Sequence, residues 1–124
     1  MKIFLAEDNE DNYLVVKSNL RKVKAPFELI WAKDGEEAIE ILQNESEIAI
    51  FLLDIEMPKI DGVGVAKWIH EQERFENIPI VAITASVFAE MKKMYVEKGF
   101  DHILEKPFSR KEFLNMLDLV GGIR

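Results

Sequence analysis

The sequence contains no cysteine, and only two of its 124 residues are histidine. The lack of cysteine excludes a disulfide scaffold and any zinc or iron–sulfur site held by thiolates. The apolar runs are short, and acids follow the first of them, so we expect neither a membrane span nor a signal peptide. The 16 basic residues do not balance the 23 acidic ones, which leaves a net charge of −7. A nucleic acid is therefore not an expected partner of this chain alone.

Short apolar runs alternate with helical patterns along the whole chain. The pattern predicts strands over residues 2–6, 27–32, 49–54 and 78–84, and a short one at Ile103-Leu104. It predicts a helix after each strand: one carrying Tyr13 to Val23, one after Asp34, one carrying Val65 and running to about Arg74, one over 87–98 ended by Gly99, and one carrying Phe113 to Val120. Such an order favours an α/β fold with a parallel sheet and helices on both faces. We expect a single domain over residues 1–124, with no output domain in this chain.

Local signals also predict where two of the helices begin. A capping box pairs an N-cap side chain with an acid three residues later, and a hydrophobic staple packs the residue before the cap against one inside the helix. The predicted boxes are Asp34 with Glu37 and Ser109 with Glu112, and the predicted staple is Phe108 with Phe113.

The stretch from Ala49 to Leu53 is apolar throughout and runs straight into Asp54. An apolar run without alternation is typical of a strand buried on both faces of a parallel sheet. Ligands of open α/β sheets bind outside the carboxyl ends of the strands, which is where Asp54 is expected. Taken alone, Asp54 could simply be the first residue of the next loop, so its interpretation depends on the other strand ends.

Residue types suited to chemistry stand at four of the predicted strand ends. Glu7 and Asp8 follow the first strand, and Asp54 ends the third. Thr84 ends the fourth strand, and Lys106 follows the fifth. Each has an ordinary explanation alone: helix-start acids, a loop aspartate, a strand threonine and a solvated lysine. Because parallel strands end at one edge of the sheet, we expect these side chains to meet, and their combination favours a functional site.

Carboxylates that meet at one edge repel each other, and a bound cation removes that repulsion. Oxygen ligands without nearby cysteine or histidine favour Mg²⁺ or Mn²⁺ over zinc. A cation, a lysine and a hydroxyl beside a carboxylate suit phosphoryl transfer through an aspartyl-phosphate. Asp54 is then the nucleophile, and Asp8, helped by Glu7, holds the metal. Lys106 and the Thr84 hydroxyl bind phosphate oxygens.

These motifs resemble the CheY-like receiver domain of two-component response regulators. The resemblance covers essentially the whole chain, in the family's order and spacing. The family is similar in fold to flavodoxin, which implies a doubly wound (βα)5 sandwich with strand order 2-1-3-4-5. The motifs are Leu5-Ala6-Glu7-Asp8-Asn9, Leu53-Asp54-Ile55-Glu56-Met57-Pro58 with Asp61-Gly62, Ile83-Thr84-Ala85, and Lys106-Pro107-Phe108.

The resemblance implies that Asp54 accepts a phosphoryl group from a phosphohistidine on a sensor histidine kinase or histidine phosphotransfer protein in a phosphorelay. It implies Mg²⁺ bound by Asp8, Asp54 and the main-chain carbonyl of Glu56, with Glu7 acting through water. Lys106 would pair with the phosphate, while Thr84 and the backbone of Ala85 would hydrogen-bond it. The Lys106-Pro107 bond is expected to be cis. Such a domain catalyses its own phosphorylation and slow dephosphorylation, without turnover of a separate substrate.

The sequence departs from the family's pattern at the switch. Position 103, which is often aromatic, is Ile103, so an aromatic rotamer change is not available there. Glu56 and Ser86 occupy positions that influence how fast the phosphate is lost. The resemblance implies a cytoplasmic protein, a monomer or weak dimer without direct nucleic-acid or membrane contact. Its output face toward a downstream protein would be the fourth helix, fifth strand and fifth helix, with Phe88, Lys92, Ile103 and Arg110.

Three other functions fit parts of the pattern. A metal-dependent aspartyl phosphatase also uses a strand-end aspartate, but its paired aspartates flank one position on the first strand. A flavin-binding protein of the same topology wants a hydroxyl- and glycine-rich phosphate loop after the first strand, where this chain has acids from Glu7 to Asp11. A degenerate receiver would act only as a phosphorylation-independent interaction module, and the presence of Asp8, Asp54, Thr84 and Lys106 argues against it.

Overall fold

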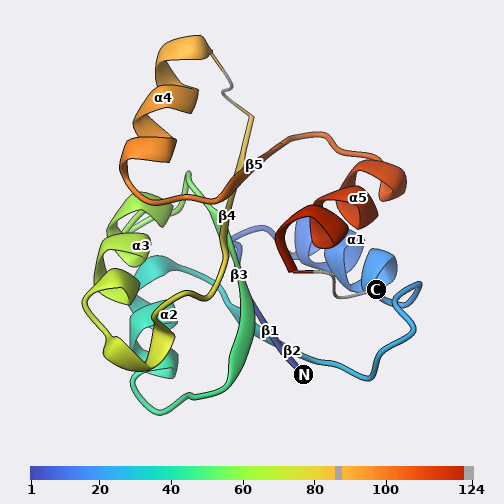
Figure 1. Cartoon of the computed structure of the whole chain (residues 1–124), viewed down its shortest axis with the longest axis horizontal. Helices are drawn as coiled ribbons and strands as arrows, with labels where there is room; N and C mark the ends of the chain where they lie inside the picture. The colour runs from blue at the N-terminus through green and yellow to red at the C-terminus, as the bar shows by residue number, and fades with distance from the viewer. Residues whose placement is uncertain (86–87, 122–124) are drawn as a thin grey trace.

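Five parallel strands form one sheet in the order β2-β1-β3-β4-β5, with helices on both faces (Figure 1). The computed structural model describes residues 1–85 and 88–121. This topology confirms the predicted flavodoxin-like (βα)5 fold. In chain order the elements are β1 (Lys2–Ala6), α1 (Glu10–Leu20), β2 (Glu28–Ala32), α2 (Gly35–Leu42), β3 (Ile48–Asp54), α3 (Gly62–His70), the 3-10 helix η1 (Glu73–Phe75), β4 (Ile80–Thr84), α4 (Ala89–Glu97), β5 (His102–Glu105) and α5 (Arg110–Gly121).

Two hydrophobic layers hold the helices to the sheet. Helices α2, α3 and α4 cover one face, and α1 and α5 cover the other (Figure 1). The central strand β3 supplies both layers alternately: Phe51 and Leu53 belong to the first, and Ile50 and Leu52 to the second. All four side chains are fully buried. This burial on both faces explains why the strand has a continuous apolar sequence. Asp54 lies at the carboxyl end of this buried strand.

The helix predicted over 87–98 is α4, Ala89–Glu97, and Val87 lies outside the described residues. Two other predicted helices end earlier than expected. The first helix ends at Leu20 rather than near Val23, which stays buried in the same hydrophobic layer. The third ends at His70, and Arg74 lies in the separate 3-10 helix η1. The Arg74 guanidinium donates to the carbonyls of Leu42 at 2.6 Å and Glu45 at 3.0 Å, at the carboxyl end of α2. The Leu42 carbonyl also accepts from the Glu45 N–H at 3.3 Å, so Arg74 adds a second donor there and ties η1 to the end of α2.

The predicted caps are present. Ser109 Oγ accepts from the Glu112 N–H at 3.0 Å, and the Glu112 carboxylate accepts from the Ser109 N–H at 3.1 Å. The rings of the predicted staple, Phe108 and Phe113, have centroids 5.8 Å apart. Asp34 Oδ1 accepts from the Glu37 N–H at 2.8 Å. The Glu37 carboxylate accepts from the N–H of Lys33, the residue before the cap, and not from the Asp34 N–H as in a full capping box. Gly99 ends α4 with φ +90, which favours glycine.

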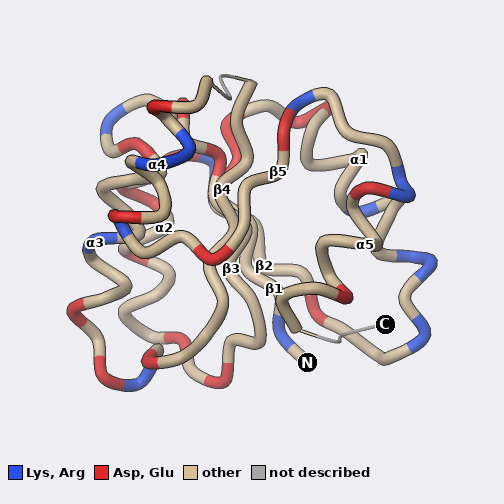
Figure 2. Tube along the Cα trace, turned by 45° about the horizontal axis from the view of Figure 1, so that its top comes forward, with Lys and Arg blue, Asp and Glu red and all other residues tan. Residues whose placement is uncertain are grey.

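Charged positions are distributed over the helices and loops on all sides of the sheet (Figure 2). The net charge of −7 is therefore not concentrated at one edge. Among the described residues, no helix combines the length and the apolar character needed to cross a membrane.

Candidate functional site

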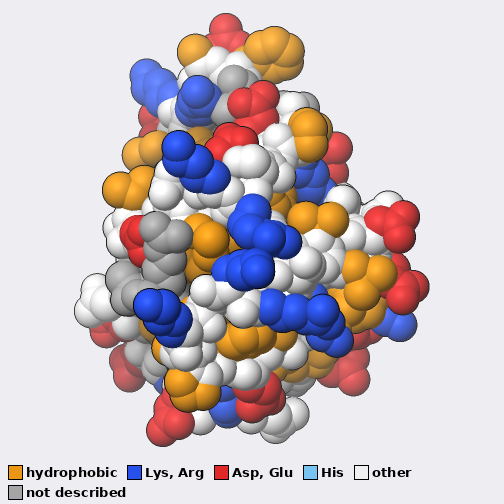
Figure 3. All heavy atoms as spheres, turned by 90° about the vertical axis from the view of Figure 1, so that its right-hand side faces the viewer, with side chains coloured by type: hydrophobic (Ala, Val, Ile, Leu, Met, Phe, Trp, Pro, Cys, Tyr) orange, Lys and Arg blue, Asp and Glu red, His pale blue; other side chains and the backbone are white. Residues whose placement is uncertain are grey.

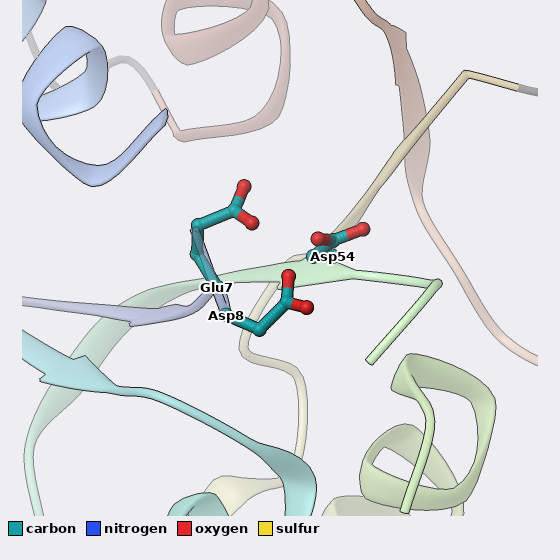
Figure 4. Close-up of side chains that lie close together, drawn as sticks. All are labelled: Glu7, Asp8 and Asp54. Atoms are coloured by element: carbon teal, nitrogen blue, oxygen red, sulfur yellow. The ribbon is translucent and has the colours of Figure 1, made fainter. Parts of the chain in front are cut away.

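Three carboxylates meet at the carboxyl edge of the sheet. Glu7 and Asp8 follow β1, and Asp54 ends β3 beside them (Figure 4). Each can offer an oxygen atom within 4.8 Å of the others. Glu7 and Asp54 are only 1% and 2% exposed, whereas Asp8 faces solvent. The sequence prediction that these acids converge is confirmed, and Asp8 is the member of the group that faces solvent.

Lys106, the residue after β5, bridges two of these carboxylates. Its Nζ lies 3.1 Å from Asp54 Oδ2 and 3.2 Å from Glu7 Oε1. Its backbone N–H donates to the Thr84 carbonyl at 2.9 Å, which ties the end of β5 to the end of β4. The Lys106-Pro107 peptide bond is cis, as expected. The Lys106 side chain thus contacts Glu7 and Asp54, at the ends of β1 and β3, and its backbone is bonded to Thr84, at the end of β4.

The loop after β3 fixes the direction of the Asp54 side chain. The Glu56 N–H donates to Asp54 Oδ1 at 3.1 Å, so each carboxylate oxygen of Asp54 has its own donor. The Gly62 N–H closes the loop on the Ile55 carbonyl at 3.0 Å. A Cβ at Gly62 would lie 2.5 Å from the Asp54 carbonyl oxygen, so only glycine fits there. Asp61 then caps α3, with its Oδ1 2.8 Å from the Gly64 nitrogen.

The loop after β1 is held by residues that the sequence did not single out. Asn9 caps α1 by accepting from the Asn12 N–H at 3.1 Å, and its own N–H donates to Glu7 Oε2 at 3.2 Å. The Trp31 indole Nε1–H donates to the Glu7 carbonyl at 2.8 Å. Asn9 could have been recognised as a helix cap, because Asn is favoured at that position. Trp31 lies 24 residues from Glu7 and alternates within β2 like any strand residue, so the sequence carries no signal of its contact.

Burial and crowding change the proton affinity of this group. Burial first, and then the hydrogen bond and charge of Asp54, raise the pKa of Glu7 from 4.5 to about 7, against a smaller opposing effect of Lys106. Burial by itself would lower the pKa of Lys106, but the charges and hydrogen bonds of Asp54 and Glu7 outweigh it and raise that pKa. A proton on Glu7 and an ammonium on Lys106 therefore stabilise a site that would otherwise hold two buried negative charges.

The remaining predicted residues lie along β4 and β5. Thr84 is fully buried at the end of β4, and Ala85 follows it at the surface. Ser86 lies outside the described residues. Ile103 is half-buried in β5 and packs against the hydrophobic layer under α4. Phe88 is 70% exposed, which decides that it belongs to the surface and not to the core.

A model of the response regulator receiver domain matches residues 3–118 of the sequence. The chain belongs to this family. The receiver domain of the sensor histidine kinase PA1611 from Pseudomonas aeruginosa, whose structure has a magnesium ion coordinated in the active site cleft, superposes with a TM-score of 0.83. The two receiver domains are 28% identical in sequence, and the superposition covers 96% of this chain and 95% of that one.

Two curated relatives carry the receiver domain within longer proteins. Stress response regulator protein 1 of Candida tropicalis is 33% identical over 121 residues, which are 98% of this chain and 44% of that protein. The autoinducer 2 sensor kinase/phosphatase LuxQ of Vibrio parahaemolyticus is 34% identical over 107 residues, which are 86% of this chain and 12% of that protein. The chain thus spans less than half the length of these relatives. Receiver domains like this one occur both in response regulators and in histidine kinases of two-component systems.

Proposed function

We propose that this receiver domain is a phosphoacceptor, and that Asp54 takes a phosphoryl group from a phosphohistidine of a sensor histidine kinase or histidine phosphotransfer protein. One Asp54 carboxylate oxygen attacks phosphorus, the phosphorus–nitrogen bond breaks, and the imidazole nitrogen keeps the electron pair while the ring takes up one proton from water. The product is an acyl phosphate on Asp54 and a free histidine. The observation that carries this proposal is the buried Asp54 carboxylate, oriented by the Glu56 N–H and paired with Lys106.

The acidic group also suits a cation. The donor set consists of oxygen atoms alone, which favours Mg²⁺, with Mn²⁺ as a substitute. Asp8, Asp54 and the main-chain carbonyl of Glu56 would hold it, and Glu7 would act through water. When bound, the cation neutralises the carboxylates and draws phosphate oxygens to the site. The receiver domain of PA1611, with its coordinated magnesium ion, supports this assignment.

Three further groups would hold the phosphoryl group on Asp54. Lys106 is already within ion-pair distance of Asp54 and would pair with a phosphate oxygen. The Thr84 hydroxyl and the backbone N–H of Ala85 would donate hydrogen bonds to the others. No turnover of a separate substrate is required, because the domain catalyses only its own phosphorylation and its slow dephosphorylation. Glu56 and Ser86 would set the rate of that loss.

The phosphodonor would approach across the face formed by α1 and α5. Figure 3 shows Lys and Arg side chains gathered in the middle of this face, with apolar side chains between them. Leu14 and Val15 of α1 are 48% and 45% exposed. Val15 also lines a depression that reaches Lys106 and Phe108. A protein that delivers a phosphoryl group to Asp54 has to cover the surface next to Lys106, and this face provides apolar area for it.

The output surface would be formed by α4, β5 and α5. Phe88 and Lys92 are exposed there, and Ile103 is half-buried in β5. Arg110 is exposed too, but its guanidinium Nε donates to Asn19 Oδ1 of α1 at 3.4 Å, so its side chain lies against α1. A downstream protein would bind this surface differently after Asp54 is phosphorylated. Because Ile103 has no ring to reorient, the change would begin at Thr84 and Lys106, the residues that would hold the phosphoryl group.

Phosphorylation can be tested with a small donor. Incubation with acetyl phosphate and Mg²⁺ should add the mass of one phosphoryl group, detected by intact-protein mass spectrometry and removed by hydroxylamine. Asp54→Asn should abolish the addition, and Asp11→Asn, an exposed acid in the first turn of α1, should retain it. An Asp54→Asn protein that still gains the phosphoryl mass would contradict the assignment. A domain that gains no mass but binds its partner would be the phosphorylation-independent module.

A further inference from the structure

Trp31 of the edge strand β2 makes a polar contact with the acidic loop. Its indole Nε1–H donates a hydrogen bond of 2.8 Å to the main-chain carbonyl of Glu7. That carbonyl belongs to the peptide group between Glu7 and Asp8. The indole therefore contacts the one planar unit that joins the two acids of the loop covalently.

The contact stands where the sheet ladder ends. The last ladder-type bond between β1 and β2 runs from the Glu7 N–H to the Ala32 carbonyl at 3.0 Å. Strand β2 ends at Ala32. The next acceptor, the Glu7 carbonyl, receives its hydrogen bond from the Trp31 indole N–H, a side-chain donor. Trp31 thus extends the hydrogen bonding of the sheet by one peptide group into the loop that carries Asp8.

The Trp31 ring is itself held in place. It stacks on the ring of Tyr13 in α1, with the centroids 4.0 Å apart and the planes at 5°. Lys33 lies over the Trp31 ring at 5.4 Å from its centroid, and Lys17 over the Tyr13 ring at 5.9 Å. Tyr13 lies in the first turns of α1, the helix that follows the acidic loop. Trp31 therefore contacts both sides of this loop, because its N–H binds the Glu7 carbonyl at the start and its ring stacks on Tyr13 after the end. The stack limits rotation of the indole, so the direction of its N–H is determined.

We propose that Trp31 is a positioning residue for the cation site, acting through the peptide group between Glu7 and Asp8. Asp8 faces solvent, so the direction of its carboxylate depends on its backbone more than on surrounding side chains. When the preceding peptide plane is fixed, the Asp8 carboxylate has fewer orientations in the cation-free protein. Binding of the cation then costs less conformational entropy. The inference rests on the proposed cation site and adds to it a residue from the edge of the sheet.

The test uses Trp31→Phe, which retains an aromatic ring for the stack and removes the N–H donor. Mg²⁺ binding is measured by isothermal titration calorimetry at a temperature well below unfolding. Partners that hydrogen-bond a metal ligand directly typically change affinity by about tenfold or more. Trp31 acts on the peptide group before the ligand Asp8, so we expect Trp31→Phe to weaken Mg²⁺ binding measurably, but by less than that factor. The rate of phosphorylation by acetyl phosphate should recover to the wild-type value at saturating Mg²⁺, since Trp31 touches none of the reacting atoms.

Two matched variants control for the loss of an aromatic group. Trp68→Phe removes the other tryptophan, which lies on α3, and Tyr13→Phe keeps both the stack and the indole donor. Both should bind Mg²⁺ with wild-type affinity. In Trp68→Phe, Trp31 is the only indole, so a change in its fluorescence on addition of Mg²⁺ reports directly on the loop.

Unchanged Mg²⁺ affinity in Trp31→Phe would overturn the inference, whatever happens to the melting temperature. If that variant does not fold, replacing Trp31 with β-(3-benzothienyl)alanine removes the N–H while keeping the shape of the ring, and the same two outcomes decide. Asp8→Asn separates this inference from the site itself. Loss of Mg²⁺ binding in Asp8→Asn with no effect of Trp31→Phe refutes only the role of Trp31, whereas unchanged binding in Asp8→Asn refutes the cation site.

Discussion

Protonation of Glu7 should make the stability of the cation-free protein depend on pH. The pKa of Glu7 is about 7 in the folded protein, against an ordinary value of 4.5. This difference corresponds to roughly 3 kcal/mol, at about 1.36 kcal/mol for each pKa unit. Between these two pH values the folded protein holds a proton that the unfolded chain has lost. Its stabilising contribution is fully present below pH 4.5 and is lost as the pH rises through 7.

The variant Glu7→Gln isolates this group, because a glutamine amide does not titrate. We would measure the free energy of unfolding by urea denaturation in EDTA, from about pH 5 to about pH 8, for wild type and variant. The difference between the two proteins cancels the titration of the other carboxyl groups. We expect Glu7→Gln to gain roughly 2–3 kcal/mol relative to wild type over this range. Glu40→Gln, on the exposed side of α2, is the matched control and should show a constant difference.

A constant difference between wild type and Glu7→Gln across the range would refute this reasoning, because it would mean that Glu7 is already ionised in the folded protein at pH 5. Mg²⁺ provides a second arm. A bound cation favours the charged carboxylates, so saturating Mg²⁺ should flatten the pH dependence of wild type. Asp8→Asn should prevent that flattening. Mg²⁺ that left the wild-type profile unchanged would show that the cation does not reach Glu7.

Three other substitutions test the contacts that build the site and its supports. Gly62→Ala should lower the free energy of unfolding by about 1–3 kcal/mol and slow phosphorylation by acetyl phosphate, because its Cβ meets the Asp54 carbonyl; unchanged rates would show that the loop yields without moving Asp54. Ser109→Ala should cost about 1 kcal/mol in urea denaturation through loss of the α5 cap, with Mg²⁺ affinity unaltered. Gly99→Ala should cost about 1–3 kcal/mol, since φ is +90 and the Cβ would collide with the His70 imidazole. Adding His70→Ala should relieve only the collision, so a full recovery would contradict the role of backbone strain.

Local patterns in the sequence were sufficient for a parallel α/β sheet with helices on both faces and for the acids at its strand ends, whereas the strand order was implied by the family resemblance. The apolar run of β3 and the Ser109 cap each depend on residues within a few positions of one another. The contacts between distant segments are of another kind. Trp31 reaches Glu7 beside the site across 24 residues, and Arg74 reaches Leu42 at the end of α2 across 32. Such pairings are determined by how the elements pack, so no periodicity or spacing in the sequence announces them.

The pKa of Glu7 belongs to the same class. Neighbouring acids were expected to repel, but the amount depends on how much water the fold removes from each of them. Glu7 is 1% exposed and Asp8 faces solvent, although they are adjacent in sequence and alike in chemistry. Burial is the largest cause of the raised pKa of Glu7, so this pKa depends on how the fold packs around the end of β1 and not on the sequence next to it.

Burial also connects the chemistry of Asp54 to the rest of the fold. In a dry site, an added phosphoryl charge interacts strongly with every group around it. Lys106 and Thr84 are the groups at hand from the neighbouring strands, and their backbones are bonded to each other at 2.9 Å. From Thr84 the chain continues toward α4, and from Lys106 toward α5. In the proposed function, with Ile103 in place of a ring that could reorient, the added charge would therefore act first on Thr84 and Lys106, at the ends of β4 and β5.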